Sequence, residues 1–260
     1  EEARFDAIDQ IAVAARASGA QHIVVAGDVL DAEDIAQRTI RQAIERMAKH
    51  DQLVWHLLPG NHDPARRGGV WDRIAAMGLP DGIRPRTTTT VHEIAEGVHL
   101  LTAPLLARSA SEDPTSAFER LPTPEGSIRI GLAHGSIKSF SGAGRAGEAT
   151  SSGLAASTGQ RRESAGGRLD TIDPKRAATA GLAYLALGDW HGMTRIDPRT
   201  WYSGTPEPDG FLDNQPGYAL AVILDGAAAP VVTPVATASF VWRAERLAVE
   251  SLADLEQAAT

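Results

Sequence analysis

Apolar residues recur with two different periods along the first 80 residues of the chain. Residues 2–18 carry apolar side chains at the spacing of one helical face, and Gly19 follows where a helix would end. Residues 22–26 form a mostly apolar run, which is typical of a buried parallel strand. The alternation continues with a helix expected over residues 33–49, a strand over 53–58 and a short helix over 70–77. This rhythm predicts a layered α/β domain with a mainly parallel sheet.

The pattern changes after residue 85, where short apolar runs bounded by turn residues predict strands. These runs are residues 89–94, 97–102, 128–133, 183–187, 200–203, 218–224 and 239–244. A helix is expected near residues 174–181, and residues 251–254 resemble a capping box that opens a last helix. Residues 139–170 are rich in Gly, Ser, Ala and Thr, which predicts a long flexible loop.

Composition narrows the class of protein. With 43% apolar residues among 260, the chain can bury a sizeable core, so wholesale disorder is excluded. The net charge of -8 excludes binding of nucleic acid by bulk charge, and any such contact has to be local or assisted by metal ions. The absence of cysteine excludes disulfides, iron–sulfur clusters and thiol catalysis. Because no apolar run approaches the length of a membrane span, we expect a cytoplasmic protein that does not enter a membrane.

Polar side chains gather directly after four of the predicted strands. They are Asp28 and Asp31 after the first strand, Asn61, His62 and Asp63 after the second, His134 after residues 128–133, and Asp189 and His191 after residues 183–187. Glycines stand beside them and permit tight turns. Ligands of α/β sheets bind at the carboxyl ends of the strands, so these side chains are candidates for one site.

Metal binding is the chemistry that this set of residue types favours. A carboxylate can bridge two cations, an amide oxygen is a neutral hard ligand, and imidazole supplies nitrogen. Asp189 and His191 are two positions apart, so in an extended segment both side chains point the same way. Each piece alone has an ordinary interpretation as a turn, a helix cap or a hydrogen-bonded histidine. Their occurrence together after four strands favours the metal site.

Four short blocks resemble the calcineurin-like metallophosphoesterases. They are Gly-Asp-Val-Leu-Asp at 27–31, Gly-Asn-His-Asp at 60–63, His-Gly at 134–135 and Gly-Asp-Trp-His at 188–191. The resemblance extends over about residues 20–225. It implies an α/β/β/α sandwich of two sheets with helices outside, and hydrolysis of a phosphodiester assisted by two metal ions. It also implies a metallophosphoesterase domain over 1–225, with 226–260 forming C-terminal strands and a helix that lead toward a further module.

The resemblance assigns metal-binding roles to individual residues. Asp28 would bridge two divalent ions, Asn61 and His134 would bind the second ion, and His191 the first. Asp189 stands where the family most often has histidine, and we expect it to bind the second ion. Its oxygen favours manganese over zinc, with magnesium, ferrous iron and zinc as alternatives. If the Asp189 side chain points away from the metal ions instead, the aspartate in place of histidine indicates a weakened metal site.

Catalytic roles are implied in the same way. His62 would stand close to the scissile phosphate as a general acid or charge stabiliser, and Asp63 would orient it. Asp31 would be a hydrogen-bonding group behind the ligands. The family also begins with a strand that ends in Asp-x-His, and nothing before Asp28 supplies this pair, because Asp6 lies in the predicted first helix. We therefore expect the N-terminal strand of the domain to be missing from this chain, the alternative being an ordinary processing boundary.

Within the superfamily, residues 184–192 and 201–208 resemble the SbcD-like DNA repair exonucleases. This implies DNA as the substrate, an SbcC-like coiled-coil ATPase as partner, and a homodimer. Arg66 and Arg67 follow the Asn-His-Asp block and are candidate phosphate contacts, although a solvated charged face is the ordinary alternative. Two other functions stay open: a small-molecule phosphodiesterase or phosphatase on the same site, and a degenerate, non-catalytic scaffold for an ATPase.

The other histidines are interpreted as structural or surface residues without partners. They are His22, His50, His56, His92 and His99.

Overall fold

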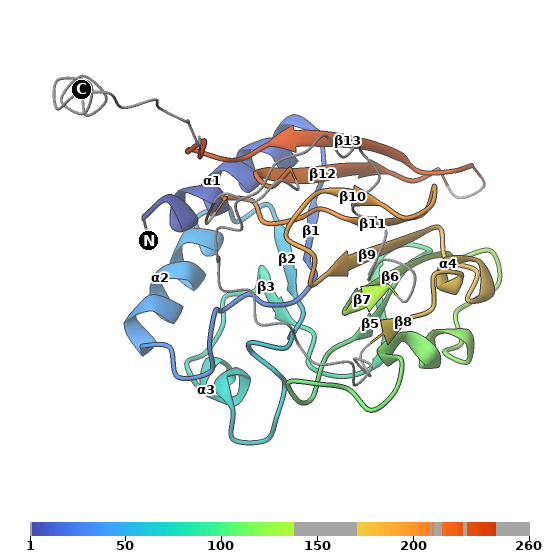
Figure 1. The fold of residues 1–260 in the computed structure, drawn as a ribbon, viewed down its shortest axis with the longest axis horizontal. Coiled ribbons are helices and arrows are strands. Elements are labelled where there is room, and N and C mark those ends of the chain that lie inside the picture. Colours follow the sequence, from blue (N-terminus) through green and yellow to red (C-terminus); the bar gives the residue numbers. More distant parts are fainter. Residues whose placement is uncertain (1, 138–170, 209, 211–214, 226–227, 243–260) are drawn as a thin grey trace, which may run out of the picture.

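Two sheets stack face to face in the computed structural model, which describes residues 2–137, 171–208, 210, 215–225 and 228–242 (Figure 1). The first sheet is parallel and has three strands in the order β1-β2-β3. The strands are β1 (His22–Val25), β2 (Val54–Leu57) and β3 (Ile83–Pro85). The second edge of β1 pairs with no strand in the described part of the chain.

The second sheet has six strands in the order β10-β11-β9-β6-β5-β4. Its strands are β4 (Thr90–Ala95), β5 (Val98–Ala103), β6 (Ile128–His134), β9 (Tyr184–Gly188), β10 (Thr194–Arg195) and β11 (Thr200–Tyr202). The four central strands are parallel, and an antiparallel strand closes each edge. The carboxyl ends of β6 and β9 therefore lie beside each other.

Helices and small strand pairs make up the rest of the described secondary structure. The helices are α1 (Glu2–Ala17), α2 (Gln37–Ala48), α3 (Val70–Ala76), the 3-10 helix η1 (Pro114–Glu119) and α4 (Arg176–Thr179). The strand pairs are β7 (Ser136–Ile137) with β8 (Thr171–Ile172), and β12 (Tyr218–Ile223) with β13 (Val231–Ala236). None of the described helices is long and apolar enough to cross a membrane.

Three apolar clusters separate the layers. One packs α1, α2 and α3 against one face of the first sheet, with Ile40 of α2 and Trp55 of β2 among its buried members. A second lies between the sheets and contains Leu58, Leu100 and Leu132. The third covers the far face of the six-stranded sheet, where η1 and α4 pack. Neighbouring residues of β5 thus face opposite layers, as a strand buried on both faces requires. The predicted layered α/β/β/α fold is confirmed.

Two differences from the sequence prediction have physical causes. Helix α2 begins at Gln37 rather than near residue 33. Residues 33–36 belong to the loop after β1. The strand expected at 239–244 is absent over its described residues, 239–242, and β13 stands at Val231–Ala236 instead. Pro234 makes this segment look unlike a strand in the sequence, because proline cannot donate a backbone hydrogen bond. Proline is nevertheless tolerated at the edge of a sheet.

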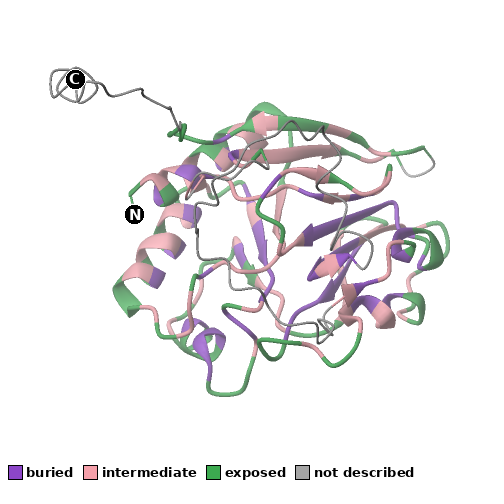
Figure 2. Cartoon of the chain, viewed as in Figure 1, coloured by how far each residue is buried: buried purple, intermediate pink, exposed green. Residues whose placement is uncertain are grey.

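The β12–β13 hairpin lies at the outside of the fold and is pink and green in Figure 2, whereas most of β9 is purple because it is buried. The two strands of the hairpin lie on either side of residue 225, where the sequence predicts the end of the metallophosphoesterase domain. This domain boundary stays a prediction. The predicted loop at 139–170 and the predicted helix opening at 251–254 lie outside the described residues.

Candidate active site

The ends of β1, β2, β6 and β9 bring four of the predicted ligands together. The Nε2 atom of His134 lies 2.8 Å from Asn61 Oδ1, 3.4 Å from Asp28 Oδ2 and 4.0 Å from Asp189 Oδ1. Two donor atoms bound to one cation at about 2.1 Å stand about 3 to 4 Å apart. The three oxygens therefore lie at the distances from His134 Nε2 that separate two ligands of one cation.

The second ring nitrogen of His134 fixes which nitrogen faces this set. His134 Nδ1 donates a hydrogen bond to the carbonyl oxygen of Ala26 at 2.8 Å, because a carbonyl can only accept. In a neutral ring, Nε2 then turns its lone pair toward the three oxygen atoms. A backbone carbonyl behind the ring is the usual arrangement of a metal-binding histidine.

This donor set fits a divalent cation. Four electron-pair donors that converge without a hydrogen between them repel one another unless a cation or an extra proton lies among them. Among the described residues, His, Asp and Glu alone do not form a group of three that could hold a metal ion. The fit therefore depends on the amide oxygen of Asn61, which completes the set around His134.

Three glycines allow the strand ends to approach each other. A Cβ added to Gly27 would lie 2.1 Å from His134 Nδ1, and one added to Gly60 would lie 2.2 Å from Asp28 Oδ1. A Cβ on Gly188 would lie 1.8 Å from the carbonyl oxygen of Ala26. Any side chain at these positions would push the ligands apart, so the glycines beside the motifs are explained by close packing at the site.

Two of the candidate ligands have a strained backbone. Asp28 has φ of 50° and Asp189 has φ of 105°, in the region that side-chain-bearing residues rarely adopt. Such conformations typically cost on the order of 1–3 kcal/mol and persist where the surrounding structure imposes them. Their location at both turns that carry a carboxylate toward His134 is consistent with a functional constraint.

Asp63 lies beneath the site and joins two of its loops. Its carboxylate accepts hydrogen bonds from the main-chain N–H groups of Gly60, at 2.7 Å, and Leu30, at 3.1 Å. Burial raises the pKa of Asp63 to about 7, and its backbone hydrogen bonds oppose that rise. The indole nitrogen of Trp71 donates to the Asp63 carbonyl oxygen at 2.5 Å. Asp63 therefore holds the loop after β1 against the loop after β2.

His62 is exposed beside the four candidate ligands. The sequence predicts that Asp63 orients it, whereas the structure gives it hydrogen bonds to Asp28 and Asp31. Its main-chain N–H donates to Asp28 Oδ1 at 2.9 Å, and its Nδ1 lies 3.0 Å from the carbonyl oxygen of Asp31. The ring is thus oriented by the Asp31 main chain, whereas the Asp63 carboxylate contacts main-chain N–H groups. The Asp31 side chain pairs with Arg4 at the surface.

His191 is the predicted ligand that the described contacts do not join to the others. His191 is exposed, and its carbonyl oxygen accepts a hydrogen bond from the Thr205 N–H at 2.9 Å. Among the described residues, its ring forms no hydrogen bond or ion pair with Asp28. Its assignment to the first metal ion stays a prediction.

Arg66 and Arg67 are both exposed on the loop after β2. Arg66 pairs through Nε with Glu33, a carboxylate that sequence analysis did not single out. Arg108 also lies near Glu33, and no local sequence signal connects the two because they are 75 positions apart. The meeting of these loops could only be seen in three dimensions.

The expectation that the remaining histidines lack partners was wrong for four of the five, whereas Nδ1 of the buried His99 has no hydrogen-bond partner in the described part of the structure. His22 Nδ1 lies 3.0 Å from His56 Nε2, and Arg86 donates to His56 Nδ1 and contacts His92 Nδ1 at 3.0 Å. His50 Nε2 lies 2.9 Å from Asp9 Oδ1. We call His22, His56, Arg86 and His92 the histidine network. Its partners could not be predicted because strand pairing, rather than local sequence, brings them together.

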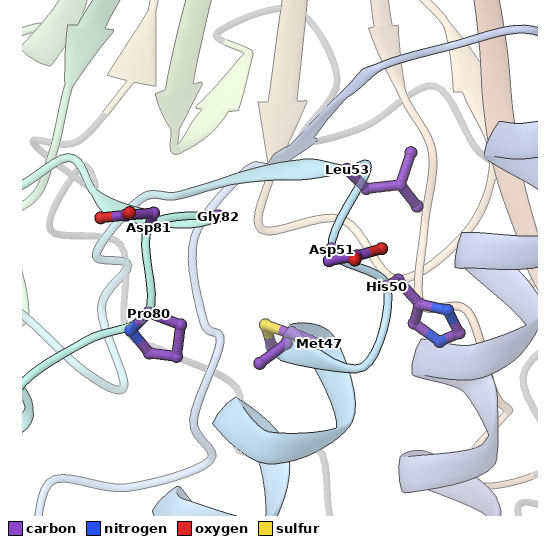
Figure 3. A pocket seen from close by; sticks show the side chains of 8 residues that line it. Met47, His50, Asp51, Leu53, Pro80, Asp81 and Gly82 are labelled. Carbon is purple, nitrogen blue, oxygen red and sulfur yellow. The ribbon is translucent and has the colours of Figure 1, made fainter.

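A small pocket opens at the other end of the strands of the first sheet (Figure 3). Leu53 and Gly82 directly precede β2 and β3, so the pocket lies at the amino ends of these strands. It is lined by Met47, Ala48, His50, Asp51, Leu53, Pro80, Asp81 and Gly82. The candidate active site lies at the carboxyl ends, and the pocket is therefore a separate feature.

Comparison with known proteins agrees with this geometry. The sequence model of the family described as calcineurin-like phosphoesterase (Metallophos) matches residues 1–152, which include Asp28, Asn61 and His134. A search of curated proteins found no match. Proteins of this family are metal-dependent phosphoester hydrolases that generally use two divalent metal ions. The match covers more than half of the chain, which therefore belongs to the calcineurin-like phosphoesterases.

Proposed function

We propose that this phosphoesterase hydrolyses the phosphodiester bonds of DNA as an exonuclease of the SbcD-like kind. The observation that carries the proposal is the surface around His62. This histidine is exposed, and the exposed Arg66 and Arg67 follow it on the same loop. In a chain with a net charge of -8, arginines beside the candidate catalytic group provide the local contact that a DNA backbone needs.

In this proposal each residue has a distinct task. Asp28, Asn61, His134 and Asp189 would hold a divalent ion, and the three oxygen donors among them favour manganese. When bound, the metal ions lower the pKa of water and neutralise charge on the phosphoryl oxygens. His62 would stabilise or protonate the leaving oxygen. Its N–H already fixes the Asp28 carboxylate, so the ligand and the catalytic group are positioned together.

One edge of β1 pairs with no strand among the described residues, which supports a further part of the proposal, that one more parallel strand belongs to the first sheet. The four residues of β1, although mostly apolar, are only half-buried. A strand beside β1 would present its carboxyl end next to Asp28 and could supply the remaining ligands of a two-metal site. Restoring an Asp-x-His strand should raise the number of bound manganese ions from one toward two.

The proposal also includes an SbcC-like coiled-coil ATPase as partner and a homodimer. It is supported by exposed apolar residues at the end of the described chain, which are Phe240, Val241 and Trp242. Sedimentation analysis of the protein alone tests the dimer. Titration with a purified SbcC-like ATPase tests the partnership, and Val241→Asp should weaken it if this surface takes part.

A nuclease assay tests the central proposal. Single-stranded and double-stranded oligonucleotides labelled at either end are incubated with manganese, and bis(p-nitrophenyl) phosphate serves as a small phosphodiester. We expect stepwise shortening of the oligonucleotides and competition between DNA and the small ester. Hydrolysis of the small ester without competition by DNA would indicate a small-molecule phosphodiesterase. Binding of manganese without hydrolysis of any substrate would indicate a non-catalytic scaffold.

A further inference from the structure

Glu33 joins two exposed arginines from different loops. Its carboxylate pairs with Nε of Arg66 and lies 3.8 Å from Nε of Arg108, and its carbonyl oxygen accepts a hydrogen bond from Arg73. The Glu33 side chain is only 14% exposed, whereas those of Arg66 and Arg108 are 61% and 74% exposed. We call Glu33, Arg66 and Arg108 the Glu33 clamp. A largely buried carboxylate here hydrogen-bonds one solvent-facing guanidinium group and forms a longer ion pair with another.

The clamp uses one nitrogen of each arginine. Both contacts to Glu33 involve Nε, and the terminal nitrogens of Arg66 and Arg108 have no hydrogen bond or ion pair among the described residues. The two terminal nitrogens of a guanidinium form the fork that binds phosphate oxygens in pairs. Two such forks therefore remain available at the surface.

Chain connectivity places the clamp beside the candidate active site. Glu33 is two residues after Asp31, whose carbonyl oxygen holds the His62 ring. Arg66 is four residues after His62 on the other loop. A phosphodiester at His62 would therefore have the clamp on one side of it.

We propose that the Glu33 clamp binds a second phosphate of the substrate, the one next to the scissile phosphate along a nucleic-acid strand. This inference rests on the proposed function and narrows it to a substrate class, a chain with successive phosphates. Arg66 and Arg108 contact the strand, and Glu33 is a positioning residue. The clamp sets the register of the strand and gives no advantage to an ester with one phosphate.

Binding of a fluorescent single-stranded oligonucleotide in EDTA, followed by anisotropy at several salt concentrations, tests the clamp without cleavage. Arg108→Ala should weaken binding about tenfold, as loss of a charge-assisted contact does, and should reduce the salt slope by about one. Arg120→Ala is the matched control, because Arg120 is an exposed arginine at the end of η1. Equal effects of Arg108→Ala and Arg120→Ala would overturn the proposal.

Glu33→Gln separates positioning from bulk charge. The substitution removes a negative charge, so general electrostatic attraction predicts tighter binding of the oligonucleotide. A clamp predicts weaker binding, because Arg66 and Arg108 both lose the negative charge with which they pair. Tighter binding by Glu33→Gln would contradict the proposal. Thermal unfolding of each variant identifies losses that come from misfolding, and Glu33→Asp, which keeps the charge, should retain more of the binding than Glu33→Gln.

Steady-state kinetics in manganese separates this proposal from the proposed function. For Arg108→Ala, kcat/KM should fall about tenfold on the oligonucleotide, mainly through KM, and clearly less on bis(p-nitrophenyl) phosphate. If the wild type binds the oligonucleotide through the clamp but does not cleave it, the exonuclease proposal fails and the clamp stands. If it cleaves DNA and Arg108→Ala has no effect, the clamp fails alone.

Discussion

Two buried histidines of this fold illustrate opposite uses of the same residue. His134 lies at the carboxyl end of β6, and His56 lies within β2, between the two sheets. Both are 1% exposed. The neighbours of His134 are the oxygens of Asp28, Asn61 and Asp189. The neighbours of His56 are Arg86 and two further histidines.

The charge of these neighbours decides the chemistry. Around His134, oxygen lone pairs attract a cation. In the histidine network, burial and then the charge of Arg86 lower the pKa of His56 to about 3 and that of His92 to about 4. The first arrangement favours metal binding, and the second keeps its imidazoles neutral. Burial of a histidine therefore says little about its function until the sign of the surrounding charges is known.

The backbone around the two groups differs as well. His56 lies in a regular parallel pairing of β1 with β2, where Val24 is its register partner. The site around His134 requires close contact with Gly27 and Gly188 and positive φ angles at two aspartates. The network thus belongs to the stable interior, whereas the site carries strain that the fold maintains.

The largest expected effect on hydrolysis comes from removing the His62 side chain. This substitution distinguishes a catalytic group from the metal ligands around His134. His62→Ala should reduce hydrolysis by about 10²–10⁴-fold, as expected for a general acid, while manganese binding survives. Asp28→Ala is the comparison, because it removes a ligand and should abolish both properties. Calorimetric titration with manganese and rates on bis(p-nitrophenyl) phosphate measure them. A large loss of bound manganese in His62→Ala would reassign this residue as a ligand.

The sequence predicts that Asp28, Asn61, His134 and Asp189 lie together because each of them follows a strand. Helical and strand periods placed β1, β2, β6 and β9, and parallel strands bring their carboxyl ends to one edge. The loops beyond the strand ends were less predictable. The target of the Asp63 carboxylate, the contact of His62 with Asp31 and the meeting of Glu33 with Arg108 all depend on loop conformation. The histidine network depends on register, because His22 and His56 are 34 positions apart.

The next largest effect is expected from a substitution that disturbs the close packing at the candidate active site and leaves the histidine network intact. Gly27→Ala should reduce activity by about 10²-fold, because its Cβ would collide with His134 and misplace the ligand. Gly97→Ala is the matched control. Both glycines have positive φ, 92° and 70°, so both variants introduce backbone strain, but a Cβ at Gly97 meets nothing within 4 Å. Equal loss of activity in both variants would show that strain, rather than the collision, matters.

A smaller effect concerns the pH dependence of stability. The folded pKa of His56, about 3, lies below its ordinary value of 6.5. Between these values the unfolded chain binds a proton that the folded chain does not, so the free energy of unfolding falls as the pH drops from 6.5 toward 3. The contribution of one such group is at most about 1.4 kcal/mol per pH unit. It is fully present above pH 6.5.

His56→Gln tests this contribution with a side chain that keeps polar atoms near Arg86 and His22 but does not titrate in this range. Urea denaturation between pH 7 and pH 4 should show a shallower decline for the variant than for the wild type. His92, whose pKa is also lowered, leaves part of the decline in place. Equal slopes in both proteins would mean that protonation of His56 does not limit stability.

The smallest effect concerns Asp189, where oxygen replaces the histidine that the family most often carries. As a ligand, Asp189 should favour manganese, and Asp189→His should shift the preference toward zinc by a modest factor without loss of the fold. Asp189→Gly separates this role from its backbone. Glycine accepts the φ of 105° without steric strain, so the variant should keep the fold while its manganese affinity falls. Competition between manganese and zinc in the wild type and both variants measures the preference. Identical ratios in all three would show that Asp189 contacts a neighbouring loop instead of a metal, and the four-donor set around His134 would shrink to three.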